Sequence, residues 1–206
     1  MILRTETVSE ELLNVIKTAF DSGLASGFRL CGGTALSLQT GTRISIDADF
    51  VIDGSFDKDK LLEQAKRTLP SVTDFRTGEH GVFFRCGKIK IDFLTWQIPF
   101  IRPEVIVDGI RMLHIEEIVA MKLYAITRRG EKKDYVDIAT LLSTYTLAEM
   151  VGFFQERHPN HDVSFVRKCL ASYADIERQP MPQMLSPLTW QEVKTILQIA
   201  LKKDLR

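Results

Sequence analysis

The stretch LCGGTALSLQTGTRISIDADFVID, residues 30–53, combines a double glycine with two aspartates that interrupt an apolar run. Gly32 and Gly33 follow an apolar segment and precede a short run of helical character. Asp47 and Asp49 then stand two residues apart in a segment that reads as a buried strand. Because side chains two residues apart on a strand point to the same face, both carboxylates are expected to project together.

Two like charges side by side repel each other, so this aspartate pair favours a bound cation. Mg²⁺ takes oxygen ligands and commonly keeps one or two carboxylates together with waters and substrate phosphates. For an isolated Asp-x-Asp, a solvated strand end is about as good an explanation. Asp92 favours the metal, because it lies on a second predicted strand between Ile91 and Phe93 and would complete a carboxylate cluster. Taken alone, Asp92 would be explained as an exposed partner of Lys90.

Gly32, Gly33 and Thr34 lead from a predicted strand over residues 28–31 into a short predicted helix over residues 34–39. Glycine lets the backbone approach a ligand closely, and the free N–H groups at a helix start favour phosphate. Thr34 is placed either to cap that helix or to contact a phosphate oxygen. A tight turn explains the same residues equally simply. A P-loop is excluded, because the chain contains no GxxxxGK[ST] motif.

A single lysine interrupts the apolar face of a predicted helix over residues 115–128. Over residues 118–126 only Lys122 is charged, and it lies within the apolar stripe. Such a lysine either extends outward to solvent or reaches a buried anion, because an unpaired charge on a core face is costly. Arg129 follows seven residues later and is expected on the same helix face, and Asp134 opens the next predicted helix.

The composition predicts a globular protein in a reducing compartment. The chain has 206 residues, of which 45% are hydrophobic and 26% charged, with a formal net charge of zero. No global field therefore draws it to nucleic acid or to an anionic membrane. Its three cysteines are far apart in sequence, which argues against a disulfide framework and a zinc knuckle. With no signal peptide and no apolar run of about 20 residues, we expect a cytoplasmic protein without a membrane partner.

The order of the predicted elements is mixed at first and purely helical later. A β-hairpin is predicted over residues 80–96, because two runs rich in Val, Phe and Ile flank a glycine-containing turn. Capping boxes are predicted at Thr7 with Glu10 and at Thr189 with Glu192, each before a helical pattern. After about residue 114 only helices are expected, over residues 115–128, 133–144, 147–157 and 163–173 and from residue 189.

The sequence GGTALSLQTGTRISIDADF, followed by KLYAI-x-x-R-x-x-x-KD-x-x-D, resembles the AbiEii/AbiGii toxin family of bacterial nucleotidyltransferases, which are similar to DNA polymerase β in their catalytic core. The resemblance is good over residues 30–53 and 113–142. It implies an α+β fold in which a nucleotidyltransferase core, a mixed β-sheet flanked by helices, spans residues 1–113. An all-helical domain, residues 114–206, is then expected to complete the active site.

The resemblance also implies Mg²⁺, an NTP substrate and specific roles for the motif residues. The implied metal ligands are Asp47, Asp49 and, on the neighbouring strand, Asp92. The implied nucleotide-binding residues are Gly32, Gly33, Thr34, Ser45, Lys122 and Arg129. The implied catalytic residues are Asp47, Asp49, Asp92, Lys122 and Asp134. Thr34 stands where a serine is commoner in the family, a change that keeps the hydroxyl group.

The function implied by the resemblance is that of a toxin from a toxin–antitoxin or abortive-infection system. An acceptor hydroxyl on RNA, in particular tRNA, would receive the nucleotide, and an antitoxin protein would be a partner. One alternative is a small-molecule nucleotidyltransferase, which zero net charge favours slightly over an RNA enzyme. The other is a catalytically degenerate binding module of the same fold, against which Asp47, Asp49 and Lys122 argue. Replacing Lys122 with Ala is expected to weaken NTP binding and to leave the fold intact.

Overall fold

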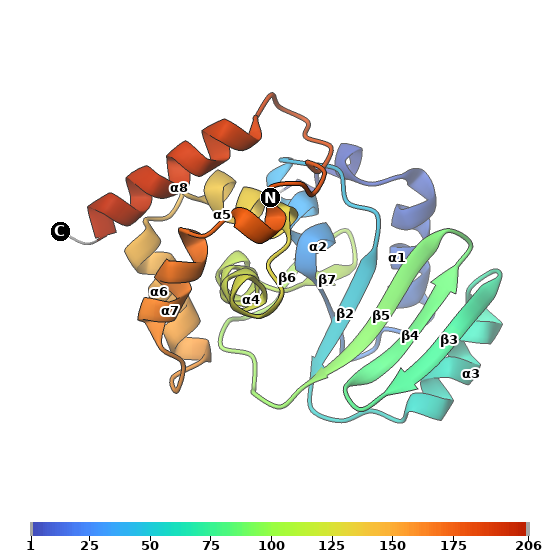
Figure 1. The fold of residues 1–206 in the computed structure, drawn as a ribbon. Helices are drawn as coiled ribbons and strands as arrows, with labels where there is room; N and C mark the ends of the chain where they lie inside the picture. Colours follow the sequence, from blue (N-terminus) through green and yellow to red (C-terminus); the bar gives the residue numbers. More distant parts are fainter. Residues whose placement is uncertain (1, 205–206) are drawn as a thin grey trace. The chain divides into compact units, whose positions relative to one another are not determined.

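The structure, a computed structural model, describes residues 2–204. The chain divides into two compact units between His114 and Ile115. The N-terminal unit contains a β-sheet and helices, and the C-terminal unit contains helices (Figure 1). The predicted α+β class, with a mixed sheet first and helices last, is therefore confirmed.

The N-terminal unit is built on a mixed sheet, in which residues 2–114 contribute seven strands in the order β3-β4-β5-β2-β1-β7-β6. The strands are β1 (Arg29–Cys31), β2 (Ala48–Asp53), β3 (Val72–Gly78), β4 (Gly81–Cys86), β5 (Ile89–Trp96), β6 (Val105–Val107) and β7 (Ile110–Met112). Strand β2 runs antiparallel to β1 and parallel to β5, and β1 runs parallel to β7. The chain segments of β2 and β5, well separated in sequence, thus become neighbours.

The predicted hairpin over residues 80–96 is confirmed as β4 and β5, which begin at Gly81 and end at Trp96. These strands pair in an antiparallel manner from Cys86 opposite Ile89 outward, and Gly87 in the turn has a φ of 58°. Strand β3 extends this hairpin on its outer side. It was not predicted from the sequence, because most of its side chains are exposed and the strand shows no apolar alternation.

Three α-helices accompany the sheet within residues 2–114: α1 (Glu10–Asp21), α2 (Gly32–Thr40) and α3 (Lys58–Thr68). In Figure 1, α1 and α3 lie behind the strands. Ser9 caps α1, because its hydroxyl accepts a hydrogen bond from the Leu12 N–H at 3.1 Å. The capping box predicted for Thr7 and Glu10 is therefore wrong. Thr7 instead ends a 3₁₀ turn, and its hydroxyl donates to the Arg4 carbonyl oxygen.

Aromatic side chains form the core on one face of the sheet. Phe50 of β2 and Phe93 of β5 are register partners, and their rings stack with centroids 4.6 Å apart. Phe20 of α1 meets the Phe50 ring edge-on at 5.6 Å. Large aromatic side chains contribute most of the apolar area in such a core. Because side chains alternate along a strand, the residue before each phenylalanine projects from the opposite face.

The C-terminal unit consists of α4 (Ile115–Arg128), α5 (Lys132–Leu141), α6 (Leu147–Arg157), α7 (Val163–Leu170) and α8 (Trp190–Asp204), with a 3₁₀ turn at Ala174–Ile176. Helix α4 packs against α5, α6 and α7. The capping box predicted at the last helix is confirmed. The Glu192 N–H donates to Thr189 Oγ1 at 3.3 Å, and the Thr189 N–H donates to Glu192 Oε2 at 2.7 Å.

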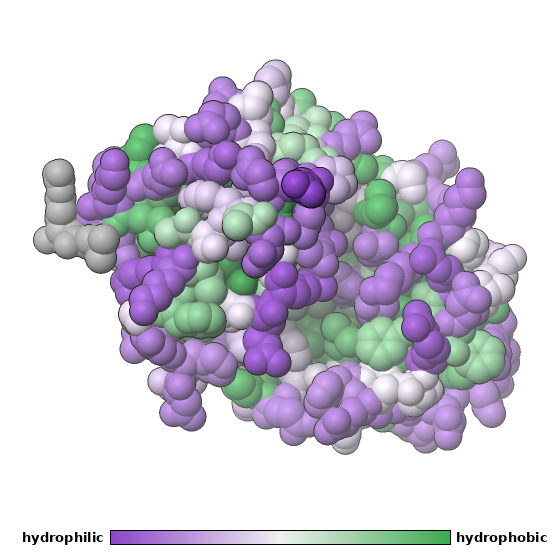
Figure 2. All heavy atoms as spheres, viewed as in Figure 1, coloured by the Kyte–Doolittle hydropathy of each residue, from purple (hydrophilic) through white to green (hydrophobic). Residues whose placement is uncertain are grey.

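The apolar residues of the chain lie mainly in the interiors of the two units. On the face shown in Figure 2, hydrophilic residues predominate and hydrophobic side chains form small patches. Among the helices of residues 2–204, none combines the length and the apolar character needed to cross a lipid bilayer.

Candidate active site

Asp49 and Asp92 lie side by side on the parallel strands β2 and β5, where they are register partners. The pair that follows, Phe50 and Phe93, points into the aromatic core, so the two carboxylates project from the opposite face of the sheet. Asp92 is buried, with 6% of its surface exposed, and Asp49 is half-buried. The sheet therefore brings together two of the three predicted metal ligands.

Asp47 lies just before β2, which begins at Ala48, one residue later than expected. The alternation of a regular strand therefore does not fix the direction of its side chain. Asp47 is half-buried, and its carbonyl oxygen accepts a hydrogen bond from the Thr34 hydroxyl. The structure thus attaches the third predicted ligand to the double-glycine segment through its backbone.

Lys90 of β5 forms an ion pair inside this acidic group. Its Nζ donates a hydrogen bond to Asp92 Oδ2 at 2.5 Å. Partial burial acts to lower the pKa of Lys90, but the hydrogen bond to Asp92 and the charges of Asp92, Asp49 and Asp47 raise that pKa above its ordinary value. The other oxygen, Asp92 Oδ1, is buried and has no hydrogen-bond partner within residues 2–204. An unsatisfied buried carboxylate oxygen is unfavourable, so Oδ1 is well suited to accept a ligand.

Gly32 allows the start of α2 to approach Asp49 closely. It has a φ of 66°, and a Cβ atom at this position would lie 2.6 Å from Asp49 Oδ2. At Gly33, a Cβ atom would overlap the Arg43 guanidinium and lie 3.4 Å from Ser45 Oγ. The positive φ of Gly32 favours glycine there, and at both positions a Cβ atom would displace the end of a side chain, Asp49 at Gly32 and Arg43 at Gly33.

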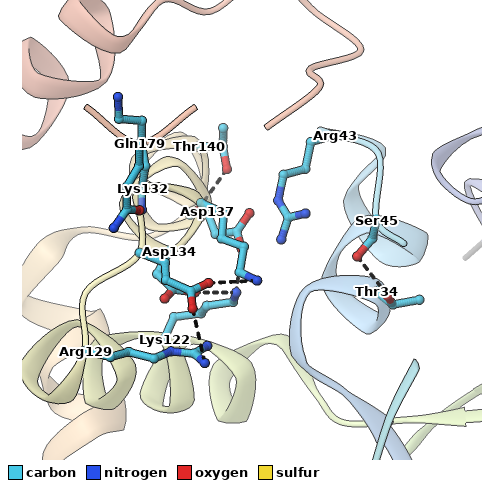
Figure 3. A network of polar contacts seen from close by, with 12 residues as sticks. Thr34, Arg43, Ser45, Lys122, Arg129, Lys132, Asp134, Asp137, Thr140 and Gln179 are labelled. Carbon is cyan, nitrogen blue, oxygen red and sulfur yellow. Dashed lines mark hydrogen bonds and ion pairs between the residues drawn. The ribbon is translucent and has the colours of Figure 1, made fainter. Parts of the chain in front are cut away.

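The Thr34 hydroxyl connects α2 to the segment before β2. Thr34 Oγ1 and Ser45 Oγ are hydrogen-bonded at 2.8 Å (Figure 3), and the Thr34 hydroxyl also bonds to the Asp47 carbonyl oxygen. Both Thr34 and Ser45 are buried. Neither hydroxyl caps the helix; together they hold residues 45–47 against the first turn of α2.

Arg43 is a candidate site residue that the sequence reasoning missed. It is buried, with 4% of its surface exposed, and its guanidinium lies against Gly33. Its Nη1 donates to the Ile44 carbonyl oxygen at 3.1 Å. One signal was available, because Arg43 is the single cationic residue of the stretch 30–53. Arginine presents several donors in a rigid fork that matches phosphate geometry.

In the C-terminal unit, Lys122 of α4 forms a buried triad with two aspartates of α5 (Figure 3). Its Nζ lies 2.7 Å from Asp134 Oδ1 and 2.7 Å from Asp137 Oδ2. The side chains of Lys122, Asp134 and Asp137 are 7%, 1% and 1% exposed. Of the two alternatives drawn from the sequence, the buried anion is therefore correct. Asp137 was not predicted as a site residue, although it lies one helical turn from Asp134.

Arg129 directly follows α4, and 59% of its side chain is exposed. Its Nη1 forms an ion pair with Glu131 Oε1 at 3.4 Å. Partial burial would raise the pKa of Glu131, but the hydrogen bond and charge of Lys133, followed by the charges of Arg129 and Lys122, lower it. The structure therefore places Arg129 in an exposed charged turn. The role of Arg129 in nucleotide binding stays a prediction.

The donor set around Asp49 and Asp92 fits a metal that is shared with a substrate. Within the part of the chain that the structure describes, no three His, Cys, Asp or Glu side chains form a group that could hold a metal ion by themselves. Two carboxylates lie on adjacent strands, and one of them, Asp92, has a buried oxygen without a partner among residues 2–204. Mg²⁺ is commonly bound in this way, with substrate phosphates and waters completing its octahedral shell.

Known proteins resemble this chain in sequence. A family model described as "Nucleotidyl transferase AbiEii toxin, Type IV TA system" matches residues 15–198. An uncharacterized protein of Aquifex aeolicus is 28% identical over 204 residues, which cover 96% of this chain and 98% of that protein.

Solved structures share the fold. A candidate nucleotidyltransferase from H. pylori is 19% identical, with a TM-score of 0.61 and coverage of 96% of this chain and 97% of that one. MenT4, a nucleotidyltransferase toxin from Mycobacterium tuberculosis H37Rv, is 13% identical, with a TM-score of 0.57 and coverage of 94% and 84%. At these identities the likeness shows a common architecture of sheet and helices.

Proposed function

Because the chain belongs to the AbiEii family and is a nucleotidyltransferase, we propose that it transfers a nucleotide from an NTP to an acceptor hydroxyl at the site formed by Asp47, Asp49 and Asp92. The acceptor oxygen would attack the α-phosphate, and pyrophosphate would leave as the bond between the α- and β-phosphates breaks. The observation that carries this proposal is the register pairing of Asp49 with Asp92 beside Gly32. Mg²⁺ bound there would neutralise the triphosphate and lower the pKa of the attacking hydroxyl.

The surrounding residues of the N-terminal unit would bind the triphosphate and position the reacting groups. The backbone N–H groups of Gly32, Gly33 and Thr34 open α2, where an anion is favoured. The Arg43 guanidinium, buried against Gly33, adds a positive charge next to these groups. Asp92 Oδ1, buried and without a partner within residues 2–204, would accept the proton of the acceptor hydroxyl. Ser45 would hold this arrangement through its bond with Thr34.

Lys122 and Arg129 are further proposed contacts of the triphosphate. Support for Lys122 comes from its placement between Asp134 and Asp137, which fix its ammonium and prevent it from extending into solvent. In this proposal Asp134 acts by orienting the lysine. Arg129, at the exposed end of α4, would contribute charge only.

We further propose that the acceptor is RNA, in particular tRNA, and that the chain is the toxin of a toxin–antitoxin pair with an antitoxin protein as partner. Support comes from the description of the family as a toxin of a type IV system. MenT4, which shares the fold, is itself a nucleotidyltransferase toxin and points in the same direction.

The test compares wild type with two isosteric variants of the same strand. Asp49→Asn removes one carboxylate of the pair, whereas Asp53→Asn changes an exposed residue at the far end of β2. With labelled NTP, total RNA and Mg²⁺, we expect Asp49→Asn to lower label transfer at least about 100-fold, a typical loss when electrostatic stabilisation of a reacting group is removed. Asp53→Asn should match wild type, and chelation of Mg²⁺ should abolish transfer.

The destination of the label separates the alternative functions. Label on a small metabolite or on protein would refute an RNA acceptor and retain the transferase. No transfer to any acceptor, together with no Mg²⁺-dependent NTP binding, would identify a degenerate binding module. Expressed alone in a bacterium, wild type and Asp53→Asn should slow growth and Asp49→Asn should not; equal growth of all three would contradict the toxin assignment.

A further inference from the structure

The Lys90 ammonium is bound to one of the carboxylates proposed to hold Mg²⁺. Its Nζ lies 2.5 Å from Asp92 Oδ2. Asp49, the register partner of Asp92, and Asp47 both act electrostatically on the same ammonium. The positive charge of Lys90 thus already neutralises part of the negative charge of these aspartates.

The two partners of this ion pair differ in their freedom to move. The Asp92 side chain is 9% exposed, and β5 is paired along both edges, with β4 and with β2. The Lys90 side chain is 46% exposed. It ends a flexible four-carbon stem that can keep its charge in water. Lys90 can therefore leave the pair without any change in the sheet, whereas Asp92 is fixed.

We propose that Lys90 competes with the divalent cation for Asp92: its ammonium occupies Asp92 Oδ2 in the metal-free protein and is repelled towards solvent when a metal binds. This inference rests on the proposed metal-dependent transfer. Two cations bound to one carboxylate repel each other at such short range, so Lys90 and the metal weaken each other's binding. The Lys90 charge also reduces the mutual repulsion of Asp47, Asp49 and Asp92 while no metal is bound.

One consequence is that the site discriminates between free metal and metal that arrives with a nucleotide. Free Mg²⁺ has to compete with Lys90 and gains only the carboxylates of Asp49 and Asp92 as protein ligands. A metal complexed with a triphosphate brings phosphate oxygens as additional ligands, and the phosphate charge can pair with the displaced ammonium. Lys90 would thus lower the affinity for the metal alone more than the affinity for the metal–nucleotide complex.

The test measures Mn²⁺ binding to the full chain, without nucleotide, by electron paramagnetic resonance or calorimetry. We expect Lys90→Gln to tighten Mn²⁺ binding by about three- to fivefold, in line with the strength of a partly exposed ion pair. Lys88→Gln is the matched control, because it removes the same charge from the exposed turn of the same hairpin. Lys88→Gln should leave the Mn²⁺ affinity within about twofold of wild type, because water and salt screen the exposed charge of the turn from the carboxylates. Lys90→Arg, which keeps the charge, should resemble wild type.

The outcomes separate this inference from the proposed function. Lys90→Gln binding Mn²⁺ as wild type does, or more weakly, while Asp49→Asn abolishes binding, would overturn the role of Lys90 and leave the metal site standing. Mn²⁺ binding that is insensitive to Asp49→Asn in both the wild-type and the Lys90→Gln background would overturn the metal site and the inference together. Circular dichroism of each variant verifies that the sheet is retained.

Discussion

Gly32 decides how closely α2 approaches the carboxylates. Its positive φ is rare for other residues, and a Cβ atom there would collide with Asp49 Oδ2. We expect Gly32→Ala to lower the free energy of unfolding by about 1 to 3 kcal/mol through backbone strain. It should also abolish Mn²⁺ binding, because the Asp49 carboxylate has to move away. Urea unfolding and Mn²⁺ titration measure the two effects.

Gly109→Ala is the matched control for Gly32→Ala. Gly109 has a φ of 78° in the turn between β6 and β7, and a Cβ atom there would meet nothing within 4 Å. This variant should share the backbone strain and keep the wild-type affinity for Mn²⁺. Retention of that affinity by Gly32→Ala as well would show that the Asp49 position does not depend on the glycine.

The environment of His158, which follows α6, predicts that the stability of the C-terminal unit depends on pH. Its ring stacks on Tyr124 at 4.7 Å, and burial, followed by the charges of His161 and Arg157, lowers its pKa to about 4. The unfolded chain, with a histidine pKa of about 6.5, binds this proton first as the pH falls. Stability should therefore be highest above about pH 6.5 and decline as the pH falls towards about 4.

Urea unfolding between pH 7 and pH 4.5 tests the role of His158. His158→Gln should reduce the loss of stability in this range, whereas His80→Gln, at an exposed position of the N-terminal unit, should leave it unchanged. Identical pH profiles for wild type and His158→Gln would assign the effect to other groups.

The Lys122 triad joins α4 to α5, and its burial changes an expectation drawn from the sequence. Replacement of Lys122 was expected to leave the fold intact. Lys122→Met, however, would leave Asp134 and Asp137 buried without their cation. Removing one partner of a buried ion pair is destabilising by about 3 to 5 kcal/mol. We expect this loss in the free energy of unfolding of the C-terminal unit.

The combination of Lys122→Met with Asp134→Asn and Asp137→Asn separates stability from binding. This triple variant carries no uncompensated charge and should be more stable than Lys122→Met alone. If Lys122 binds the triphosphate, the folded triple variant should still bind NTP more weakly than wild type. Wild-type NTP affinity in that variant would limit Lys122 to a structural role.

At the scale of elements, the sequence predicted those that carry a strong apolar period. Helix α4 and the hairpin of β4 and β5 show clear patterns and were predicted with nearly correct bounds. Strand β3 was missed because its side chains are mostly exposed, and β6 and β7 were missed as well. A strand whose side chains are mostly exposed has no apolar periodicity to detect.

At the scale of the whole molecule, the sequence predicted which types of residue form the candidate site, but it did not predict most of the contacts between them. Alternation predicted which face of each strand carries Asp49 and Asp92, but it does not reveal that β2 and β5 are neighbours. The approach of Gly32 to Asp49 and the burial of Arg43 likewise depend on pairings distant in sequence. Local patterns contain no information on such pairings, which is why Arg43 and Lys90 became candidates only with the structure.

The position of β1 in the sheet has a consequence for how the protein is made. Leu30 of β1 pairs with Phe50 on one side and with Met112 on the other. During translation, the first partner leaves the ribosome soon after β1, whereas the second emerges only when the N-terminal unit is nearly complete. Until then β1 presents an open edge, which invites pairing with other chains. Because closing such a long loop is slow, docking of β7 is expected to be a late folding step, and the nascent chain is most prone to aggregation just before it.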